Sequence, residues 1–282
     1  MRSPRFGDCP EPTAEEDCVS DSRTALVTGA SSGIGAAVAR LLAERGYTVY
    51  GTSRNPATAP SIAGVTFVAL DLESTESIEK CFEEVGEVDV LVNNAGESQS
   101  GPLEELPMAA LERLFQLNVF GAIRLTQLVL PGMRRRGYGR VVMIGSMLGS
   151  FPLAFRSSYV ATKAAIKGFA TAARRELAPY GVAITTVEPG AIATGIGTRR
   201  THHLADGSPY TAEYDTMIEH LDANERGGIA PRKVAQKIVA AIESDSPREL
   251  YAIGSGAPAV FVLQRLLPRT VVTRLVARRH GL

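Results

Sequence analysis

The chain has 282 residues, of which 45% are hydrophobic, so it is long enough to bury a substantial core. Thirty acidic residues balance thirty basic ones, and the formal net charge of zero gives no global field that would recruit nucleic acid. The three cysteines, Cys9, Cys18 and Cys81, form no CxxC pair, which favours a reducing compartment such as the cytoplasm over a disulfide framework.

The N-terminal segment 1–22 is predicted to be a disordered leader. It carries three prolines and six acidic residues, and it lacks the apolar stretch that a signal peptide needs. No uninterrupted apolar run reaches the roughly eighteen residues that span a bilayer. We therefore expect a single soluble domain over 23–254, followed by a C-terminal extension over 255–282.

From Thr24 onward, short runs of β-branched residues alternate with longer segments of helical period. This alternation is typical of βαβ units and predicts an α/β fold: a Rossmann-type doubly wound sheet of seven mainly parallel strands with helices on both faces. The predicted strands are 25–28, 48–52, 66–70, 88–92, 140–144, 183–187 and 250–253, and the predicted helices are 35–45, 75–85, 108–136, 157–179 and 231–243.

The segment 195–228 interrupts the alternation, because it is polar and contains Gly207, Ser208 and Pro209. In an α/β fold, an insertion near the carboxyl ends of the strands usually covers the ligand crevice, so we expect a mobile lid here. The segment also holds His202 and His203. No further ligand stands at metal-binding spacing except Asp206, so a solvated loop explains the histidines better than a metal site.

A glycine-rich turn, Thr28-Gly29-Ala30-Ser31-Ser32-Gly33-Ile34-Gly35, follows the first predicted strand and opens an apolar helix. This context places backbone N–H groups and the positive end of a helix dipole around a pyrophosphate. Gly29 permits the tight turn, Gly33 lets the backbone approach the phosphates, and Gly35 lets the helix pack close to the strand. A turn that uses its glycines only for packing is the alternative. The strand and helix around it favour a dinucleotide site that also includes Ser31, Ser32 and Ile34.

The end of the second predicted strand, Thr52-Ser53-Arg54, indicates which dinucleotide binds. No carboxylate stands there to accept hydrogen bonds from the ribose 2′-hydroxyl of NAD. A guanidinium can instead bind a 2′-phosphate through charge-assisted hydrogen bonds. Arg54 therefore favours NADP(H) over NAD(H), with an ordinary solvated arginine as the alternative interpretation.

Tyr159 and Lys163 stand four residues apart in a predicted helix, so their side chains lie one turn apart on the same face. They follow Ser146, which comes just after the fifth predicted strand and so faces the ligand crevice. A nearby ammonium stabilises a phenolate and lowers a phenol pKa from its usual value of about 10. The pattern therefore predicts Tyr159 as a proton-transferring acid/base, with Ser146 polarising the substrate oxygen.

These motifs together resemble the short-chain dehydrogenase/reductase family. The resemblance rests on the TGxxxGIG turn, on Asn93-Asn94-Ala95-Gly96, on the Tyr159 and Lys163 pair, and on Pro189-Gly190-Ala191-Ile192-Ala193-Thr194, and it spans about 24–253. The run 140–149 and the long C-terminal extension look most like the branch that contains 17β-hydroxysteroid and retinol dehydrogenases.

The resemblance implies roles for further residues. Asp71 is expected at the adenine ring, Lys163 at the nicotinamide ribose, Ile192 at the nicotinamide carboxamide, and Thr194 at the carboxamide or a phosphate. Asn118 matches the family's fourth catalytic residue, which anchors a water that relays protons to Lys163. A satisfied polar side chain or a helix irregularity is the alternative for Asn118. The remaining expected cofactor-binding residues are Asn94, Ala95, Gly96, Tyr159, Pro189 and Gly190.

The function implied is an NADP(H)-dependent oxidoreductase that interconverts an alcohol and a ketone or aldehyde, with a bulky lipophilic substrate such as a steroid or retinoid-like compound. A stand-alone ketoreductase of secondary metabolism would use the same residues. A non-catalytic NADP-binding sensor or scaffold is the alternative of another class, and the four filled catalytic positions argue against it. The family resemblance also implies a homodimer or homotetramer.

The chain has no acidic residue after Glu249, while five arginines accompany apolar residues between 260 and 279. A basic amphipathic tail of this kind can lie weakly on an anionic membrane. It can equally cover the substrate pocket or pack against another subunit. The sequence leaves these three alternatives open.

Overall fold

The computed structural model of the chain describes residues 22–257 and 259–282, so the predicted leader 1–22 lies, except for Ser22, outside the described residues. Seven strands form one sheet in the order β3-β2-β1-β4-β6-β7-β9, and every neighbouring pair is parallel. These strands are β1 (Thr24–Val27), β2 (Thr48–Ser53), β3 (Val65–Ala69), β4 (Val90–Asn93), β6 (Gly139–Ile144), β7 (Val182–Pro189) and β9 (Leu250–Ile253). The predicted doubly wound α/β fold is confirmed.

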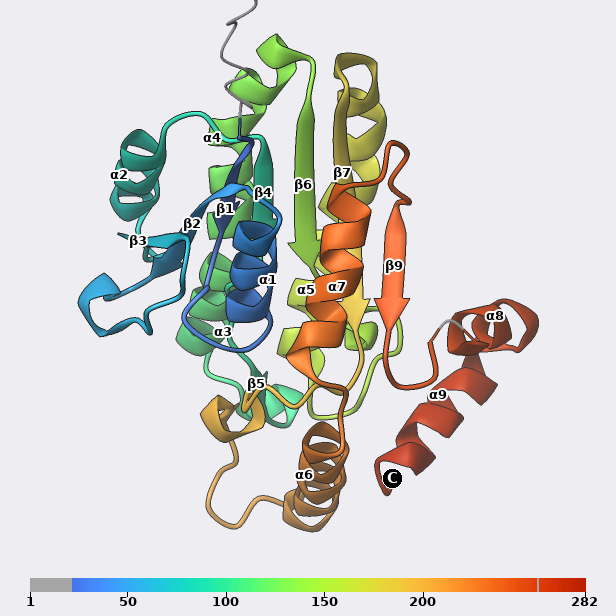
Figure 1. The fold of residues 1–282 in the computed structure, drawn as a ribbon. Helices are drawn as coiled ribbons and strands as arrows, with labels where there is room; N and C mark the ends of the chain where they lie inside the picture. The colour runs from blue at the N-terminus through green and yellow to red at the C-terminus, as the bar shows by residue number, and fades with distance from the viewer. Residues whose placement is uncertain (1–21, 258) are drawn as a thin grey trace, which may run out of the picture.

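Helices cover both faces of the sheet (Figure 1). On one face, α1 (Gly33–Glu44) and α7 (Pro231–Ile242) pack against each other and against the strands. On the other face lie α2 (Thr75–Val85), the long helix that starts at Met108, and α5 (Ser157–Leu177). The central strands are apolar on both sides because each side meets a helical layer, as in parallel sheets generally.

The long helix predicted over 108–136 is present but irregular. It consists of α3 (Met108–Phe115), a π-helical segment (Gln116–Phe120) and α4 (Gly121–Arg136). Among the described residues it is the one helix long and apolar enough to cross a membrane, but half of its apolar stretch is buried inside the fold. Leu117, Leu125 and Val129 belong to the core, so packing against the sheet accounts for the apolar character.

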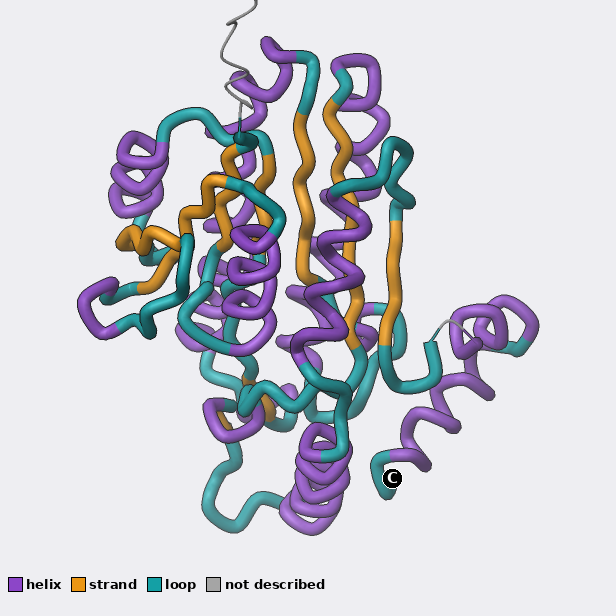
Figure 2. The backbone as a smooth tube through the Cα atoms, in the orientation of Figure 1, coloured by secondary structure: helices purple, strands orange, loops and turns teal. Residues whose placement is uncertain are grey.

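The predicted lid segment contains more regular structure than its polar composition indicates. β8 (Thr201–His202) pairs in parallel with β5 (Gln99–Ser100), and α6 (Thr211–Arg226) follows. Figure 2 shows this helix beyond the ends of the main strands. The helix was missed because most of its residues are polar. Its buried residues Tyr214, Met217 and Leu221 nevertheless stand at helical spacing.

The C-terminal extension forms α8 (Ala259–Leu266) and α9 (Arg269–Arg279). Val276 of α9 packs against the buried cluster of α6, and Val272 packs with Met147 and Phe151. The tail therefore joins the fold at the carboxyl ends of the strands, beside α6. Short 3-10 turns occupy Pro56–Thr58, Leu103–Glu105, Met147–Gly149, Ala178–Tyr180 and Gly197–Arg199.

Two helical glycines provide a matched test of this packing. A Cβ atom on Gly121 would overlap the carbonyl oxygen of Leu72 and lie 2.8 Å from its Cβ atom, whereas a Cβ atom on Gly168 meets nothing within 4 Å. We expect Gly121→Ala to lower the free energy of unfolding by about 1–3 kcal/mol, because the helix must move away from β3 and its following loop. Gly168→Ala should leave the free energy unchanged or raise it by up to about 1 kcal/mol. Urea unfolding of both variants measures the difference, and equal stabilities would contradict the close approach at Gly121.

Candidate active site

One cavity of about 1140 Å³ opens at the carboxyl ends of the parallel strands. Ordinary ligand pockets enclose about 300–1,000 Å³, so this cavity has room for a large cofactor together with a substrate. Gly35 and Asn118 lie outside its lining. The other residues predicted from the sequence all line it: Gly29, Ser31, Ser32, Gly33, Ile34, Arg54, Asp71, Asn94, Ala95, Gly96, Ser146, Tyr159, Lys163, Pro189, Gly190, Ile192 and Thr194.

The glycine-rich turn has the backbone geometry that only glycine adopts easily. Gly29 and Gly33 have φ values of +64° and +58°, in the left-handed region. A Cβ atom on Gly35 would overlap the Gly29 carbonyl group and lie 2.5 Å from the Asn94 side-chain nitrogen. Gly35 thus lets α1 begin directly against the turn, while the N-terminus of the helix faces the cavity. This is a cradle into which a pyrophosphate fits.

Asn94 holds this cradle in place from the end of β4. Its side-chain Nδ2 donates hydrogen bonds to the carbonyl oxygens of Thr28 and Gly29, at 2.9 and 3.2 Å. The Thr28 hydroxyl in turn accepts hydrogen bonds from the backbone nitrogens of Asn94 and Ala95. These contacts tie the two segments at the ends of β1 and β4 together.

A cation missed by the sequence analysis also stands at the cradle. Arg199, from the 3-10 turn after β7, donates a hydrogen bond to the Ser32 hydroxyl at 3.3 Å. Both residues line the cavity, so the guanidinium lies where a phosphate would need a counter-charge. The signal was hidden because Arg199 belongs to the segment interpreted as a lid.

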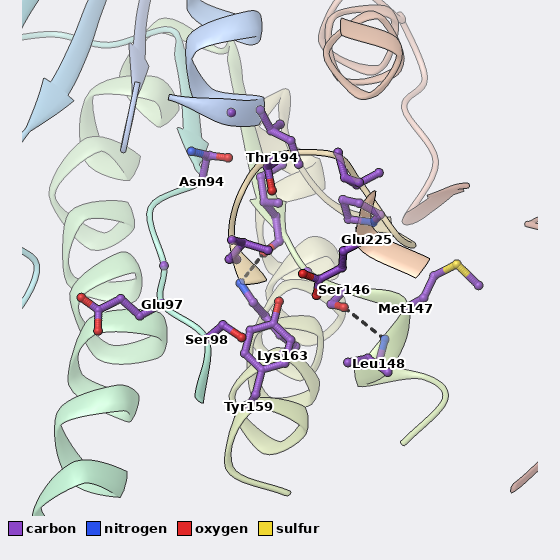
Figure 3. A pocket seen from close by; sticks show the side chains of 18 of the residues that line it. Asn94, Glu97, Ser98, Ser146, Met147, Leu148, Tyr159, Lys163, Thr194 and Glu225 are labelled. Atoms are coloured by element: carbon purple, nitrogen blue, oxygen red, sulfur yellow. Dashed lines mark hydrogen bonds between the residues drawn. The ribbon is translucent and has the colours of Figure 1, made fainter. Parts of the chain in front are cut away.

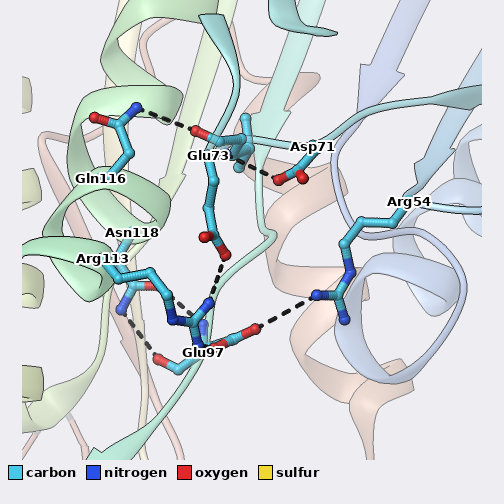
Figure 4. Close-up of polar contacts among 8 residues, drawn as sticks. Arg54, Asp71, Glu73, Glu97, Arg113, Gln116 and Asn118 are labelled. Atoms are coloured by element: carbon cyan, nitrogen blue, oxygen red, sulfur yellow. Dashed lines mark hydrogen bonds and ion pairs between the residues drawn. The ribbon is translucent and has the colours of Figure 1, made fainter. Parts of the chain in front are cut away.

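Arg54 lies at the rim of the same cavity, just after β2 (Figure 4). Its side chain is 71% exposed, and its one ion pair joins Nη1 to Oε1 of Glu97 at 3.8 Å. Glu97 is held more closely by Arg113, which also pairs with Glu73. The Arg54 guanidinium is therefore only loosely engaged by the protein.

Asp71, after β3, faces the cavity near Arg54. One of its carboxylate oxygens accepts a hydrogen bond from the backbone nitrogen of Glu73 at 2.9 Å, which shapes the turn before α2. Its backbone nitrogen donates to the hydroxyl of Ser77. The carboxylate is thus fixed at the cavity wall, with its second oxygen available to a ligand.

Tyr159, Lys163 and Ser146 converge on one part of the cavity (Figure 3). Tyr159 and Lys163 lie on the buried face of α5, and Lys163 Nζ lies 5.7 Å from the centre of the Tyr159 ring. Lys163 donates a hydrogen bond to the Ile144 carbonyl oxygen at 2.9 Å. Ser146 caps the 3-10 turn that follows it by accepting a hydrogen bond from the Leu148 backbone nitrogen.

The Asn118 side chain is buried in the π-helical segment of the long helix. Its Oδ1 accepts a hydrogen bond from the Glu97 backbone nitrogen, and its Nδ2 donates to the Glu97 carbonyl oxygen. Nδ2 also lies 3.2 Å from the hydroxyl of Thr162, one residue before Lys163. A Cβ atom on Gly96 would lie 3.0 Å from Asn118 Oδ1 and 3.5 Å from Lys163 Nζ, so this glycine lets both groups approach the same point.

Burial dominates the electrostatics of the two catalytic candidates. Burial raises the pKa of Tyr159, while Arg156, the hydrogen bond with Ser146 and Arg200 lower it and Glu225 raises it further. Burial also lowers the pKa of Lys163 to about 8. Both groups thus favour their neutral forms more than they would in water.

The opposite end of the cavity is apolar and is formed partly by the C-terminal extension. Side chains of α8 and α9 pack with Met147 and Phe151 in one apolar cluster there. The Phe151 ring meets Phe261 edge to face, with ring centres 4.9 Å apart. The residues contributed by the two tail helices include Val260, Leu263, Val272, Leu275 and Val276.

Comparisons with known proteins agree with this geometry. The family model described as short chain dehydrogenase matches residues 23–205. The human protein named retinol dehydrogenase 8 is 37% identical over 247 residues, which cover 80% of this chain and 79% of that protein.

Two solved structures share the fold. A short-chain dehydrogenase from Streptomyces avermitilis is 34% identical, with a TM-score of 0.77 over 91% of this chain and 96% of that one. An alcohol dehydrogenase from the archaeon Thermococcus sibiricus, complexed with 5-hydroxy-NADP, is 26% identical, with a TM-score of 0.68 over 84% and 97%. The chain belongs to the short-chain dehydrogenase family and is an oxidoreductase that acts between CH–OH and carbonyl groups.

Proposed function

We propose that the protein is an NADP(H)-dependent enzyme that interconverts a lipophilic secondary alcohol and its ketone. The observation that carries the proposal is the position of Tyr159, Lys163 and Ser146 between a glycine-lined cradle and an apolar wall in one cavity. A nicotinamide dinucleotide fits the cradle, and the apolar wall suits the carbon skeleton of a bulky substrate.

The glycine-rich cradle would hold a nicotinamide dinucleotide, which would supply the hydride for reduction of the carbonyl carbon or accept it in the reverse direction. Ser146 donates a hydrogen bond to the substrate oxygen and stabilises the charge that develops there. Tyr159 gives its hydroxyl proton to the same oxygen in reduction and takes it back in oxidation. Lys163 binds the nicotinamide ribose, and Asn118 anchors the water through which protons reach Lys163.

The preference for NADP(H) rests on Arg54. Its guanidinium stands just after β2, is largely exposed, and has a single long ion pair to exchange for a 2′-phosphate. β2 itself, Thr48–Ser53, contains no carboxylate that would accept hydrogen bonds from a free 2′-hydroxyl.

Two proposals concern the surroundings of the enzyme. Exposed aromatic rings on the long helix and on α5, Phe120 and Phe169, support a homodimer or homotetramer built on these helices.

A reducing, cytoplasmic compartment is supported by Cys81, which is a free buried thiol among the described residues. Burial raises its pKa to about 11.

The outer face of the tail is proposed to rest weakly on an anionic membrane beside the cavity mouth. Leu266 is 75% exposed and Val262 is exposed with it, and both lie next to Arg265 on α8. In a symmetric contact between two copies of this face, arginines would lie against arginines and repel each other. An anionic lipid surface would instead attract these arginines. A lipophilic substrate dissolved in the membrane would then reach the cavity directly.

Replacing Tyr159 with phenylalanine tests the chemistry. The substitution keeps the ring and removes the transferable proton, so we expect NADPH-dependent reduction of ketones to fall at least about a hundredfold. The measurement is NADPH consumption against a panel of lipophilic ketones, aldehydes and quinones. A variant as active as the parent would overturn the proposed mechanism.

Replacing Arg54 with aspartate tests the cofactor preference. The change removes a partner of the 2′-phosphate and adds a repelling charge, so the ratio of kcat/KM for NADPH to that for NADH should fall about tenfold or more. Arg40→Asp is the matched control, because Arg40 is an exposed arginine of α1 outside the cavity lining. An unchanged ratio in Arg54→Asp would defeat the assignment.

Vesicle binding tests the tail. We expect the intact protein to bind phosphatidylcholine vesicles that contain phosphatidylserine and to remain unbound with phosphatidylcholine alone. Leu266→Glu should weaken this binding about tenfold or more, whereas Leu103→Glu, at a leucine that is 73% exposed outside the tail, should leave it unchanged. Full recovery of the parent protein in the unbound fraction would refute the membrane proposal.

A further inference from the structure

The guanidinium of Arg156 is buried beside the active site without an anionic partner. The residue is 2% exposed and lines the cavity three positions before Tyr159. Its Nη2 donates a hydrogen bond to the Ser98 hydroxyl at 2.9 Å, and its Nη1 donates to the Ser100 hydroxyl at 3.2 Å. Among the described residues, no carboxylate forms an ion pair with it, and its Nε has no hydrogen-bond partner. Burying such a charge is costly, so its retention calls for a compensating interaction.

The ring of Tyr159 also lies against this guanidinium. The Arg156 guanidinium carbon lies 4.6 Å from the centre of that ring, closer than Lys163 Nζ at 5.7 Å. The negative face of a neutral phenol ring attracts a cation only weakly. A phenolate carries a full negative charge shared by its oxygen and ring, and burial strengthens its attraction to the guanidinium.

The backbone is held in an unusual conformation to place this side chain. Phe155, just before Arg156, has a φ value of +60°, which a residue with a bulky side chain rarely adopts. Its carbonyl oxygen accepts a hydrogen bond from the Gly101 backbone nitrogen at 2.9 Å. Arg156 then precedes the first turn of α5 and shares a helix face with Tyr159.

We propose that Arg156 is a positioning residue that acts through Tyr159: its guanidinium stabilises the phenolate left when the tyrosine hydroxyl gives up its proton. The inference rests on the proposed function. In carbonyl reduction the O–H bond of Tyr159 breaks, its proton forms a new O–H bond with the substrate oxygen, and the electron pair stays on the phenolate. In that state Arg156 gains the anion that it otherwise lacks, so the interaction is stronger after proton transfer than before it.

The two cations near Tyr159, Lys163 and Arg156, differ in the pH at which they lose their charge. Burial lowers the pKa of Lys163 to about 8, so its ammonium charge is lost as the pH rises through that value. Burial lowers the pKa of Arg156 only to about 10. The guanidinium is also the largest of the effects that lower the pKa of Tyr159, ahead of the Ser146 hydrogen bond. Arg156 therefore keeps a positive charge beside the phenol at a pH where Lys163 is neutral.

The other charged groups around the pair are compensated or neutral. Arg200, a side chain with 0% exposure, forms ion pairs with Asp222 at 2.7 Å and Glu225 at 2.6 Å. Burial lowers the pKa of both His202 and His280, and Arg156 lowers it further, so both are neutral above pH 7. Burial raises the pKa of Tyr214, which keeps that phenol neutral as well. Arg156 thus has no carboxylate in ion-pair contact among the described residues, and Glu225, which also raises its pKa, is already paired with Arg200.

A matched pair of variants tests the inference without any turnover. Arg156→Gln keeps a hydrogen-bond donor for the serines and removes the charge, whereas Arg156→Lys keeps the charge. The readout is the ultraviolet difference spectrum of tyrosinate against pH, with the corresponding Tyr159→Phe protein subtracted to isolate Tyr159. We expect Arg156→Gln to move the midpoint of Tyr159 upward by about one pH unit or more, and Arg156→Lys to retain most of the parent value.

The pH dependence of turnover gives a second readout. The assay is the oxidation of 2-decanol with NADP⁺. In Arg156→Gln, the acidic limb of the kcat/KM profile should move to higher pH together with the Tyr159 midpoint. Below that midpoint, kcat/KM should fall about tenfold per pH unit. Affinity for NADP⁺ should stay within about twofold of the parent. Ser98→Ala, which removes one hydrogen bond and keeps the charge, should leave the midpoint unchanged.

A merely structural role for Arg156 predicts different results. If Arg156→Gln lowers the thermal midpoint but leaves the Tyr159 titration at its parent position, the inference is overturned. The same holds if Arg156→Lys shifts the titration as far as Arg156→Gln does. Because the spectroscopic titration needs no substrate, a chain that reduces no ketone would refute the proposed function and leave this inference still open to its own test.

Discussion

Burial of the Tyr159 phenol opposes the release of its proton, because desolvation raises its pKa and favours the neutral form. Groups that interact best with a phenolate oppose this penalty: the Arg156 guanidinium first, then the hydroxyl of Ser146 and Arg200. The Arg156 guanidinium is itself desolvated, and among the described residues no carboxylate forms an ion pair with it. In the proposed reaction, the unfavourable burial of Arg156 is thus partly recovered when the proton leaves Tyr159.

The surrounding fold keeps Arg156 and the other groups around Tyr159 in place. Asn118, in the π-helical segment, binds both backbone groups of Glu97 and so fixes the segment after β4 that runs past Gly96. Ser98 and Ser100, further along that segment, receive the Arg156 hydrogen bonds. Pairing of β5 with β8 then couples the same segment to α6. The π-helical segment at Asn118 and the left-handed backbone of Phe155 both help to position the segment 97–100 and Arg156.

The sequence was sufficient for the parts of the molecule governed by local periodicity. All seven strands of the main sheet were predicted within about two residues, because parallel strands buried on both faces leave continuous apolar runs. The glycine-rich turn and the spacing of Tyr159 and Lys163 were equally readable, since each depends on neighbours in the chain. Arg156 was not predicted, because its burial depends on Ser98 and Ser100, which are distant in sequence. The helix α6 was missed because only three of its residues face the core, and the tail could not be placed because its apolar face suited three environments equally well.

The residues around Tyr159 and most of the apolar wall come from different parts of the chain. The family model ends at residue 205, and within its limits lie the glycine-rich cradle, Ser146, Tyr159, Lys163 and Arg156. The whole of α6, α8 and α9 lies beyond it, and α8 and α9 supply much of the apolar wall. Under the proposed function, the residues that set proton affinity are therefore largely separate in the chain from the residues proposed to meet the carbon skeleton. Substitutions in the tail reshape the apolar wall while Arg156 keeps its position beside Tyr159, so the proposed function allows the substrate range to change without loss of the chemistry.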